Sequence, residues 1–240
     1  MLRKSVLIFI ISLLIFETST LYAQNSNQIH VEKTSKIKPL RPEDFKHADV
    51  GNPAIAGIVT SSDGGFDIKA GGEDVWGVRD EFNFVYIEKT GDFDFAARVE
   101  SLTATHQYTK AGLMAREDLS PGSRHIYFQI FPNNIPRNKN NGGFEYQYRQ
   151  TTDGEMKAIY PARFAGTPDF PVTFPDTWIR LKRVGNKFTG YAGTDGKSWK
   201  VYSTFTLDLP EKIYLGAAVT SHNATESATA KFRDLCYIKR

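Results

Sequence analysis

Apolar and polar residues alternate with a period of two over much of this chain. Residues 82–87 read Phe-Asn-Phe-Val-Tyr-Ile, and similar alternation recurs at 93–100, 126–131, 144–149 and 179–184. Side chains two positions apart share one face of a β-strand, so each run predicts a strand with one buried face. Windows of helical length show no apolar stripe with a period of 3.6 residues. The pattern therefore predicts an all-β protein.

Gly, Asn, Asp and Pro residues separate these runs at the spacing of β-hairpins. Such residues are typical of tight turns because they tolerate or preset the required backbone angles. About a dozen short strands joined in this way predict a β-sandwich or barrel. Two longer loops, 71–81 and 159–176, are candidates for binding, and the proline-rich second loop could equally serve to protect a sheet edge.

The first 23 residues have the pattern of a secretory signal peptide. A basic start is followed by an apolar run from Val6 to Phe16, and the segment ends at Ala23. Such a signal has an apolar stretch of about 7–15 residues and a small residue at the cut, whereas a membrane anchor needs about 20 apolar residues. We therefore expect a secreted or periplasmic protein without a membrane span after cleavage. A flexible arm at 24–44 would then lead into one globular domain at 45–240.

Composition narrows the classes of partner. Cys236 is the single cysteine, so the domain has no internal disulfide and must be held together by its core. Cys236 itself is expected to be a buried strand residue rather than a nucleophile.

The formal net charge is +3, and no stripe of Lys and Arg runs along the sequence. Nucleic acid and an electrostatically bound membrane surface are therefore poor candidates for a partner.

Several fragments, taken in order, resemble one known family. They include Asp49-Val50-Gly51-Asn52-Pro53, Asp74-Val75-Trp76-Gly77, Lys110-Ala111-Gly112-Leu113-Met114-Ala115-Arg116-Glu117, Trp178-Ile179-Arg180-Leu181-Lys182-Arg183 and Val219-Thr220-Ser221-His222-Asn223. Together they are similar to the regulation-of-enolase-protein-1-like family of the concanavalin A-like lectin/glucanase superfamily, over about residues 45–240. The resemblance implies a concanavalin A-like jelly-roll sandwich of two curved antiparallel sheets. It implies no established activity and carries over no catalytic residues.

A sugar-binding site needs flat apolar faces for the C–H surface of the sugar and planar polar groups for its hydroxyls. The run 144–149 offers both, with Glu145, Gln147 and Arg149 on one face and three aromatic residues on the other. Aromatic stripes pack into the core by default, which leaves the three polar residues to line a surface. The alternative places the tyrosines of this run in the groove.

Neighbouring strands add Arg116, Tyr127 and Gln129 as candidate binding residues. We expect Arg116, Gln129 and Gln147 to meet on one face, although the register that would bring them together is not fixed by sequence. The alternative is a polar ladder that satisfies itself, with Arg116 paired to Glu117.

Trp76 and His222 complete the set of candidate binding residues. Trp76, in the 71–81 loop, is either a stacking platform for a sugar or a plug that closes one end of the sandwich. His222 ends an apolar strand beside a loop, where it is either a ligand contact or a structural hydrogen-bonding group. Trp178 and Trp199 are expected to be structural.

No cofactor is expected. The histidines form no HxH or HExxH pair, so no zinc site is predicted. A structural Ca²⁺ would need carboxylate and carbonyl oxygens. Asp49, Asp63 and Asp234 are the carboxylates that would converge if the two ends of the domain pair.

The function predicted from these patterns is non-catalytic binding of a carbohydrate or other glycan. A glycosidase needs two carboxylates about 5–5.5 Å or 6.5–9.5 Å apart, and the Glu-x-Asp-x-x-Glu run of the superfamily's glucanases is missing from the sequence. A pair across strands, such as Glu145 with Glu117, would instead indicate a glycoside hydrolase or polysaccharide lyase on the same scaffold. A structural or protein-interaction domain, marked by a large exposed apolar patch, is the third alternative.

Overall fold

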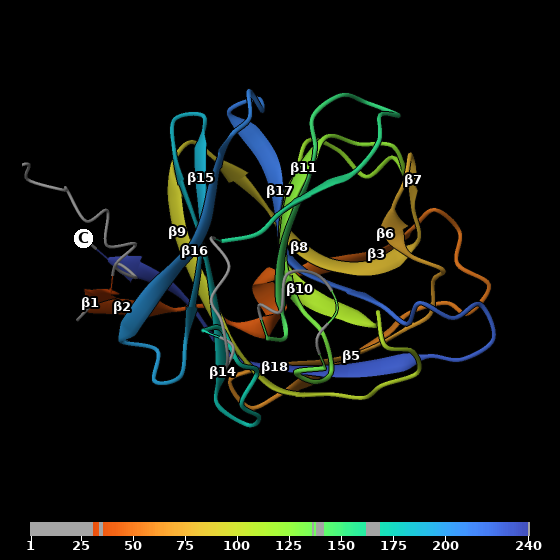
Figure 1. Cartoon of the computed structure of the whole chain (residues 1–240), viewed down its shortest axis with the longest axis horizontal. Coiled ribbons are helices and arrows are strands. Elements are labelled where there is room, and N and C mark those ends of the chain that lie inside the picture. The colour runs from red at the N-terminus through yellow and green to blue at the C-terminus, as the bar shows by residue number, and fades with distance from the viewer. Residues whose placement is uncertain (1–30, 34–35, 136, 138–141, 162–168, 240) are drawn as a thin grey trace, which may run out of the picture.

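Two antiparallel β-sheets pack face to face in the residues that the computed structural model describes, which are 31–33, 36–135, 137, 142–161 and 169–239 (Figure 1). This arrangement confirms the predicted all-β sandwich. The predicted signal segment, 1–23, lies outside the described residues. No helix in the described part of the chain is long and apolar enough to cross a membrane.

The first sheet contains nine strands. Its order is β1 (Val31–Lys33), β16 (Ser198–Thr206), β15 (Lys187–Gly193), β14 (Thr177–Val184), β9 (Phe93–Leu102), β18 (Ala228–Lys239), β5 (Gly65–Ala70) and β4 (Ile58–Ser62), and β2 (Lys36–Pro39) also pairs with β18. The 3-10 turn η1 (Pro42–Asp44) links β2 to the second sheet.

The second sheet contains seven strands. Its order is β13 (Lys157–Ile159), β12 (Phe144–Arg149), β11 (His125–Ile130), β10 (Lys110–Arg116), β17 (Lys212–Thr220), β8 (Phe82–Thr90) and β3 (Lys46–Val50). A separate two-stranded hairpin, β6 (Val75–Trp76) with β7 (Arg79–Asp80), forms within the loop predicted at 71–81.

The main core lies between the two sheets and is built from the alternation seen in the sequence. On β12, Phe144 and Tyr146 are buried in this core. The ring of Phe128 packs against Phe144, with 5.6 Å between centroids, and against Tyr202, with 5.3 Å. The Tyr146 hydroxyl donates a hydrogen bond of 3.0 Å to the Phe188 carbonyl, which satisfies its one polar group inside the core. The expectation that the aromatic face of 144–149 points into the core is thus confirmed.

The segment 24–44, predicted to be a flexible arm, contains two strands among its described residues. These strands are β1 and β2, which pair with β16 and β18 of the first sheet. The Glu32 carboxylate also accepts a hydrogen bond of 2.9 Å from buried Arg180. An edge strand offers unpaired N–H and C=O groups, so a polar segment beside it gains a ladder of hydrogen bonds. Cys236, on β18, is buried as predicted, and burial raises the pKa of its thiol to about 12.

Phe128→Ala tests the core directly. The substitution leaves a cavity between the sheets, so we expect the free energy of unfolding to fall by about 3–5 kcal/mol, measured by urea denaturation. Ile58→Ala is the control, because Ile58 is 58% exposed, and we expect a change within about 0.5 kcal/mol. Equal effects of the two substitutions would contradict the core assignment.

Candidate functional site

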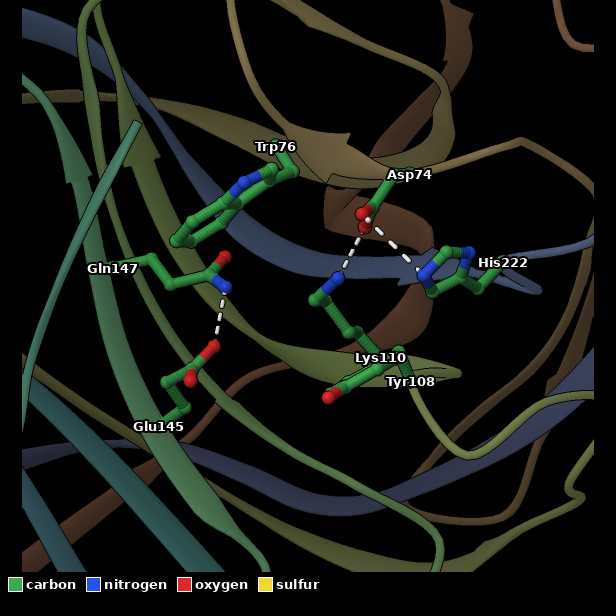
Figure 2. A pocket seen from close by; sticks show the side chains of 7 residues that line it. All are labelled: Asp74, Trp76, Tyr108, Lys110, Glu145, Gln147 and His222. Carbon is green, nitrogen blue, oxygen red and sulfur yellow. Dashed lines mark hydrogen bonds and ion pairs between the residues drawn. The ribbon is translucent and has the colours of Figure 1, made fainter. Parts of the chain in front are cut away.

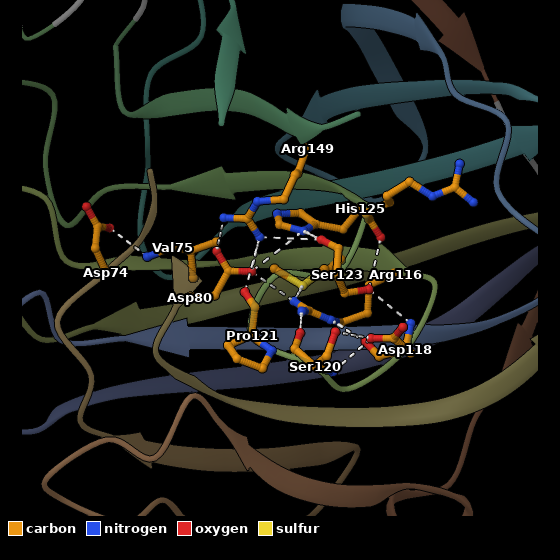
Figure 3. A network of polar contacts seen from close by, with 12 residues as sticks. Asp74, Val75, Asp80, Arg116, Asp118, Ser120, Pro121, Ser123, His125 and Arg149 are labelled. Carbon is orange, nitrogen blue, oxygen red and sulfur yellow. Dashed lines mark hydrogen bonds and ion pairs between the residues drawn. The ribbon is translucent and has the colours of Figure 1, made fainter. Parts of the chain in front are cut away.

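The face of the second sheet that points away from the core is covered by residues 71–81, here called the covering segment. Asp80, near its end, is fully buried and anchors it to the sheet (Figure 3). Arg149 donates two hydrogen bonds to the Asp80 carboxylate, of 2.6 and 2.8 Å, and Arg116 donates one of 3.3 Å. Val75 adds an apolar contact to a small cluster on the same face.

The remaining donors of the two arginines bind main-chain carbonyls. Arg116 donates to the carbonyls of Asp118 at 2.6 Å and Ser120 at 2.5 Å. Arg149 donates to the carbonyls of Gly154 at 2.9 Å and Gly77 at 3.0 Å. Both guanidinium groups are fully buried, so these two predicted binding residues instead hold the covering segment and nearby turns in place.

His125 lies beside the same carboxylate, 3.7 Å from its Oδ2 atom. Its Nδ1 is 2.9 Å from the Ser123 carbonyl, which requires that this nitrogen carry the proton and donate. Burial lowers the pKa of His125 to about 3, against the raising effect of Asp80. The ring is therefore neutral at physiological pH.

A pocket of about 290 Å³ opens beside the covering segment (Figure 2). Four separate parts of the chain supply its lining: the covering segment, the start of β10, the middle of β12 and the turn after β17. The lining residues are Asp74, Trp76, Tyr108, Lys110, Glu145, Gln147 and His222.

One side of the pocket is built around Asp74. Its Oδ1 atom accepts hydrogen bonds from the Lys110 ammonium group and from the Val75 N–H, the latter at 2.7 Å. The His222 Nε2 atom lies 3.6 Å from Asp74 Oδ2. Burial lowers the pKa of His222 and outweighs the opposite effect of Asp74, so the imidazole is mainly uncharged at neutral pH.

The other side is built around Glu145. Its Oε1 accepts hydrogen bonds from Gln129 at 3.2 Å and Gln147 at 2.5 Å, and its Oε2 accepts one from the Tyr160 hydroxyl. Strand register explains the meeting, because Gln129 on β11 lies directly opposite Glu145 on β12. The Gln147 Oε1 atom is buried without a hydrogen-bond partner among the described residues.

Aromatic groups line the pocket as well. The Trp76 side chain is 42% exposed and lies over Gln147 in Figure 2, as the stacking alternative requires. The rings of Tyr108 and His222 have centroids 5.6 Å apart, and the His106 ring lies 4.3 Å from that of His222. Trp199 is fully buried and packs edge-on against Trp178, with 6.1 Å between centroids.

The structure brings together half of the predicted binding residues. Trp76, Glu145, Gln147 and His222 line the pocket, and Gln129 contacts it through Glu145. Tyr127 does not line it: the residue is buried, and its hydroxyl donates to the Ala218 carbonyl at 3.0 Å.

Arg116, Gln129 and Gln147 lie on one face of the second sheet, but the expected meeting of Arg116 with the two glutamines does not occur. The register of β10 and β11 pairs Arg116 with His125, and places Gln129 opposite Gly112, four residues away along β10. Arg116 therefore joins the buried cluster at one end of the strand, and the two glutamines lie with Glu145 toward the other.

Sequence reasoning missed Asp74, Tyr108 and Lys110 as lining residues. Asp74 stands two positions before Trp76, and in an extended segment side chains two positions apart point to the same side. This spacing could have identified Asp74 as a neighbour of Trp76. Nothing in the local pattern marks the other two, because their place in the pocket depends on packing of distant segments.

The carboxylate pair suggested for catalysis does not form. Glu117 makes two hydrogen bonds with Arg124, at 2.7 and 2.9 Å, and is not part of the pocket lining. Asp74 is instead the carboxylate that shares the pocket with Glu145.

The carboxylates considered for Ca²⁺ are distributed over both sheets. The Asp49 carboxylate, on β3, accepts hydrogen bonds from the Gly57 N–H and the Asn83 amide. The Asp234 carboxylate, on β18, binds Arg98 at 2.6 Å. The described residues contain no group of three or more His, Cys, Asp or Glu side chains arranged to hold a metal ion.

Solved structures share this fold. A functionally unknown protein from Saccharomyces cerevisiae matches with a TM-score of 0.61 and 15% identity, over 84% of this chain and 99% of that chain. The GH43 protein BlXynB from Bacillus licheniformis matches at 0.53 and 12% identity, over 74% of this chain and 33% of BlXynB. A LamA variant from Z. galactanivorans in complex with laminaritriose and laminaritetraose matches at 0.50 and 8% identity, over 88% of this chain and 98% of that chain.

These likenesses define the class of the protein as a jelly-roll β-sandwich, and at such identities they show the fold alone. No family model matches the sequence, and no curated protein matches it.

Asp80→Asn tests the anchor. The substitution leaves two buried guanidinium groups without their anionic partner, so we expect a loss of about 3–5 kcal/mol in the free energy of unfolding, measured by urea denaturation. Glu88→Gln is the control, because it removes a carboxylate from an exposed ion pair with Lys212, and such pairs contribute at most about 1 kcal/mol. A similar small effect at both sites would show that Asp80 is not an anchor.

The buried His125 predicts acid sensitivity. The folded pKa of about 3 lies below the ordinary 6.5, so unfolded chains take up a proton that folded chains exclude as the pH falls from 6.5 toward 3. Stability from this residue is therefore complete at pH 7 and falls by about 2 kcal/mol by pH 5. Urea midpoints at the two pH values measure the effect. His125→Gln should reduce the pH dependence by that amount, and an unchanged dependence would contradict a buried neutral ring.

Proposed function

We propose that this protein is an exported, non-catalytic glycan-binding protein, and that the pocket beside the covering segment holds the glycan. The observation that supports this best is the composition of the lining. An exposed tryptophan stands beside carboxylate, ammonium, amide and imidazole groups that come from four separate segments. Sugars are recognised by this combination, because each ring has an apolar C–H face and a rim of hydroxyls.

Each lining group has a role in this proposal. The Trp76 ring stacks on the C–H face of one sugar ring. Asp74 and Glu145 accept hydrogen bonds from sugar hydroxyls, and Lys110 and Gln147 supply donors to hydroxyl oxygens. A pocket of about 290 Å³ lies near the lower end of the usual range for ligand sites, about 300–1,000 Å³. It therefore suits a short stretch of glycan rather than a long chain.

Export and family membership belong to the same proposal. The pattern of residues 1–23 supports export to the periplasm or the cell exterior. The ordered fragments quoted above support membership of the regulation-of-enolase-protein-1-like family. The LamA likeness supports glycan binding only indirectly, because one fold serves many functions.

A glycoside hydrolase or polysaccharide lyase is the second candidate, since Asp74 and Glu145 lie on different sides of one pocket (Figure 2). Hydrolysis needs one carboxyl group that is protonated and can act as an acid. Here Glu145 accepts three hydrogen bonds, and Asp74 is paired with Lys110. Both carboxylates are therefore already held by donors within the protein, and this arrangement supports binding over hydrolysis.

Trp76→Ala tests the proposal. Loss of the stacking surface should weaken binding about tenfold or more, measured by affinity electrophoresis and calorimetry on residues 24–240 with a panel of soluble polysaccharides. Ile58→Ala changes an exposed apolar residue on the first sheet, outside the pocket lining, and this variant should bind like the unmodified protein. Binding unaffected by the loss of Trp76 would place the site elsewhere, and release of reducing sugar in the same samples would favour the enzyme.

A further inference from the structure

The charges that line the pocket do not balance. Asp74 and Glu145 contribute two carboxylates, and Lys110 contributes the one permanent cation of the lining. His222 is mainly uncharged at neutral pH because burial lowers its pKa. The lining therefore carries a net charge of about −1, and a low-dielectric pocket makes that charge strongly felt by a ligand.

The lining cation is already paired. Lys110 is only 3% exposed, and its ammonium group binds Asp74. The ammonium group has three N–H donors, so it can still donate to a neutral hydroxyl oxygen. Its charge is already balanced by Asp74, however, and drawing it toward an anionic ligand would leave that carboxylate uncompensated in a partly buried site, which carries a substantial cost.

Arg137 is not one of the lining residues, and its donors and its charge already have partners within the protein. The Arg137 guanidinium lies over the Phe131 ring, 4.4 Å from its centroid. It donates to the carbonyls of Gln107 at 2.7 Å and Ile135 at 3.1 Å, and to the side-chain oxygen of Asn133 at 2.7 Å. Burial lowers the pKa of Arg137 while Tyr108 and Glu145 oppose that shift, so the charge of Arg137 already interacts with a pocket carboxylate.

We infer that this pocket selects glycans without carboxylate or sulfate groups, and so takes neutral sugars and amino sugars. The inference rests on the proposed function and specifies its ligand. Ionised carboxylates only accept hydrogen bonds, so Asp74 and Glu145 suit hydroxyl and ammonium donors. A uronic acid or a sulfated sugar brings a further anionic group, which also only accepts hydrogen bonds, toward these two carboxylates and is repelled by them.

Matched ligand pairs test this selectivity. Cello-oligosaccharides and their C6-oxidised uronate forms differ only in the carboxylate, as do methyl-esterified and de-esterified homogalacturonan. Chitosan oligosaccharides supply the ammonium-bearing case. Calorimetry on residues 24–240 should show that, in any pair that binds, the neutral member binds about tenfold tighter or more than its anionic partner at low salt. Added NaCl should narrow the difference.

Asp74→Asn provides a gain-of-binding test. The substitution keeps the side-chain shape but releases the Lys110 ammonium from its ion pair, so affinity for the anionic member should rise about tenfold. Glu117→Gln is the matched control, because it also removes a carboxylate from an ion pair with a cation, here Arg124, but outside the pocket lining. The selectivity of the control should be unchanged.

The outcomes separate the two proposals. Tighter binding of neutral or amino sugars, with anion binding gained in Asp74→Asn, supports both. Tighter binding of the anionic members overturns the selectivity and leaves glycan binding intact. Absence of binding across all three sets overturns the proposed function itself, provided that circular dichroism shows the protein to be folded.

Discussion

The pocket depends on one buried contact, the pairing of the Asp80 carboxylate with Arg116 and Arg149. A two-stranded hairpin as short as β6–β7 is not stable alone in water. It is held on the second sheet because two guanidinium groups, which would be costly to bury unpaired, meet their anion only when the hairpin is in place. Asp74 and Trp76 stand on the same segment, so the contact that fixes the segment also sets two lining residues of the pocket.

The fold could be predicted from the sequence because the pattern that specifies its strands is local. A period of two assigns strands, and turn residues at hairpin spacing separate them, so the all-β sandwich follows without long-range information. The aromatic face of β12 could be assigned for the same reason, since Phe144 and Tyr146 alternate with Glu145 and Gln147. The strands of the N-terminal arm were missed because polar edge strands carry no burial pattern and pair mainly through the main chain.

The pocket could be predicted from the sequence only in part, because it depends on strand register and on contacts between distant segments. Polar residues on the outer face of β12 could be picked out, but their roles could not. Glu145 and Gln147 line the pocket, whereas Arg149 on the same face is buried against Asp80, which lies 69 residues away in sequence. An arginine that binds a ligand and one that anchors a loop look alike until the partner is known. Lys110 was overlooked for the same reason, since its partner Asp74 is 36 residues away.

The hydrogen bonds to Asp74 and Glu145 also affect which groups of a ligand the pocket can recognise. Both carboxylates accept hydrogen bonds from donors within the protein, which holds them in fixed positions. Trp76 stays exposed beside them. Fixed acceptors beside an exposed aromatic face suit the recognition of hydroxyl groups.

The most direct test of glycan binding at this pocket is a titration of ¹⁵N-labelled protein with a neutral oligosaccharide, followed through the indole N–H signals of its three tryptophans. Trp76→Phe assigns one signal. We expect the Trp76 signal to shift saturably while that of buried Trp199 stays in place. A bound oligosaccharide that shifts only the Trp178 or Trp199 signal, or none of the three, would contradict glycan binding at this pocket.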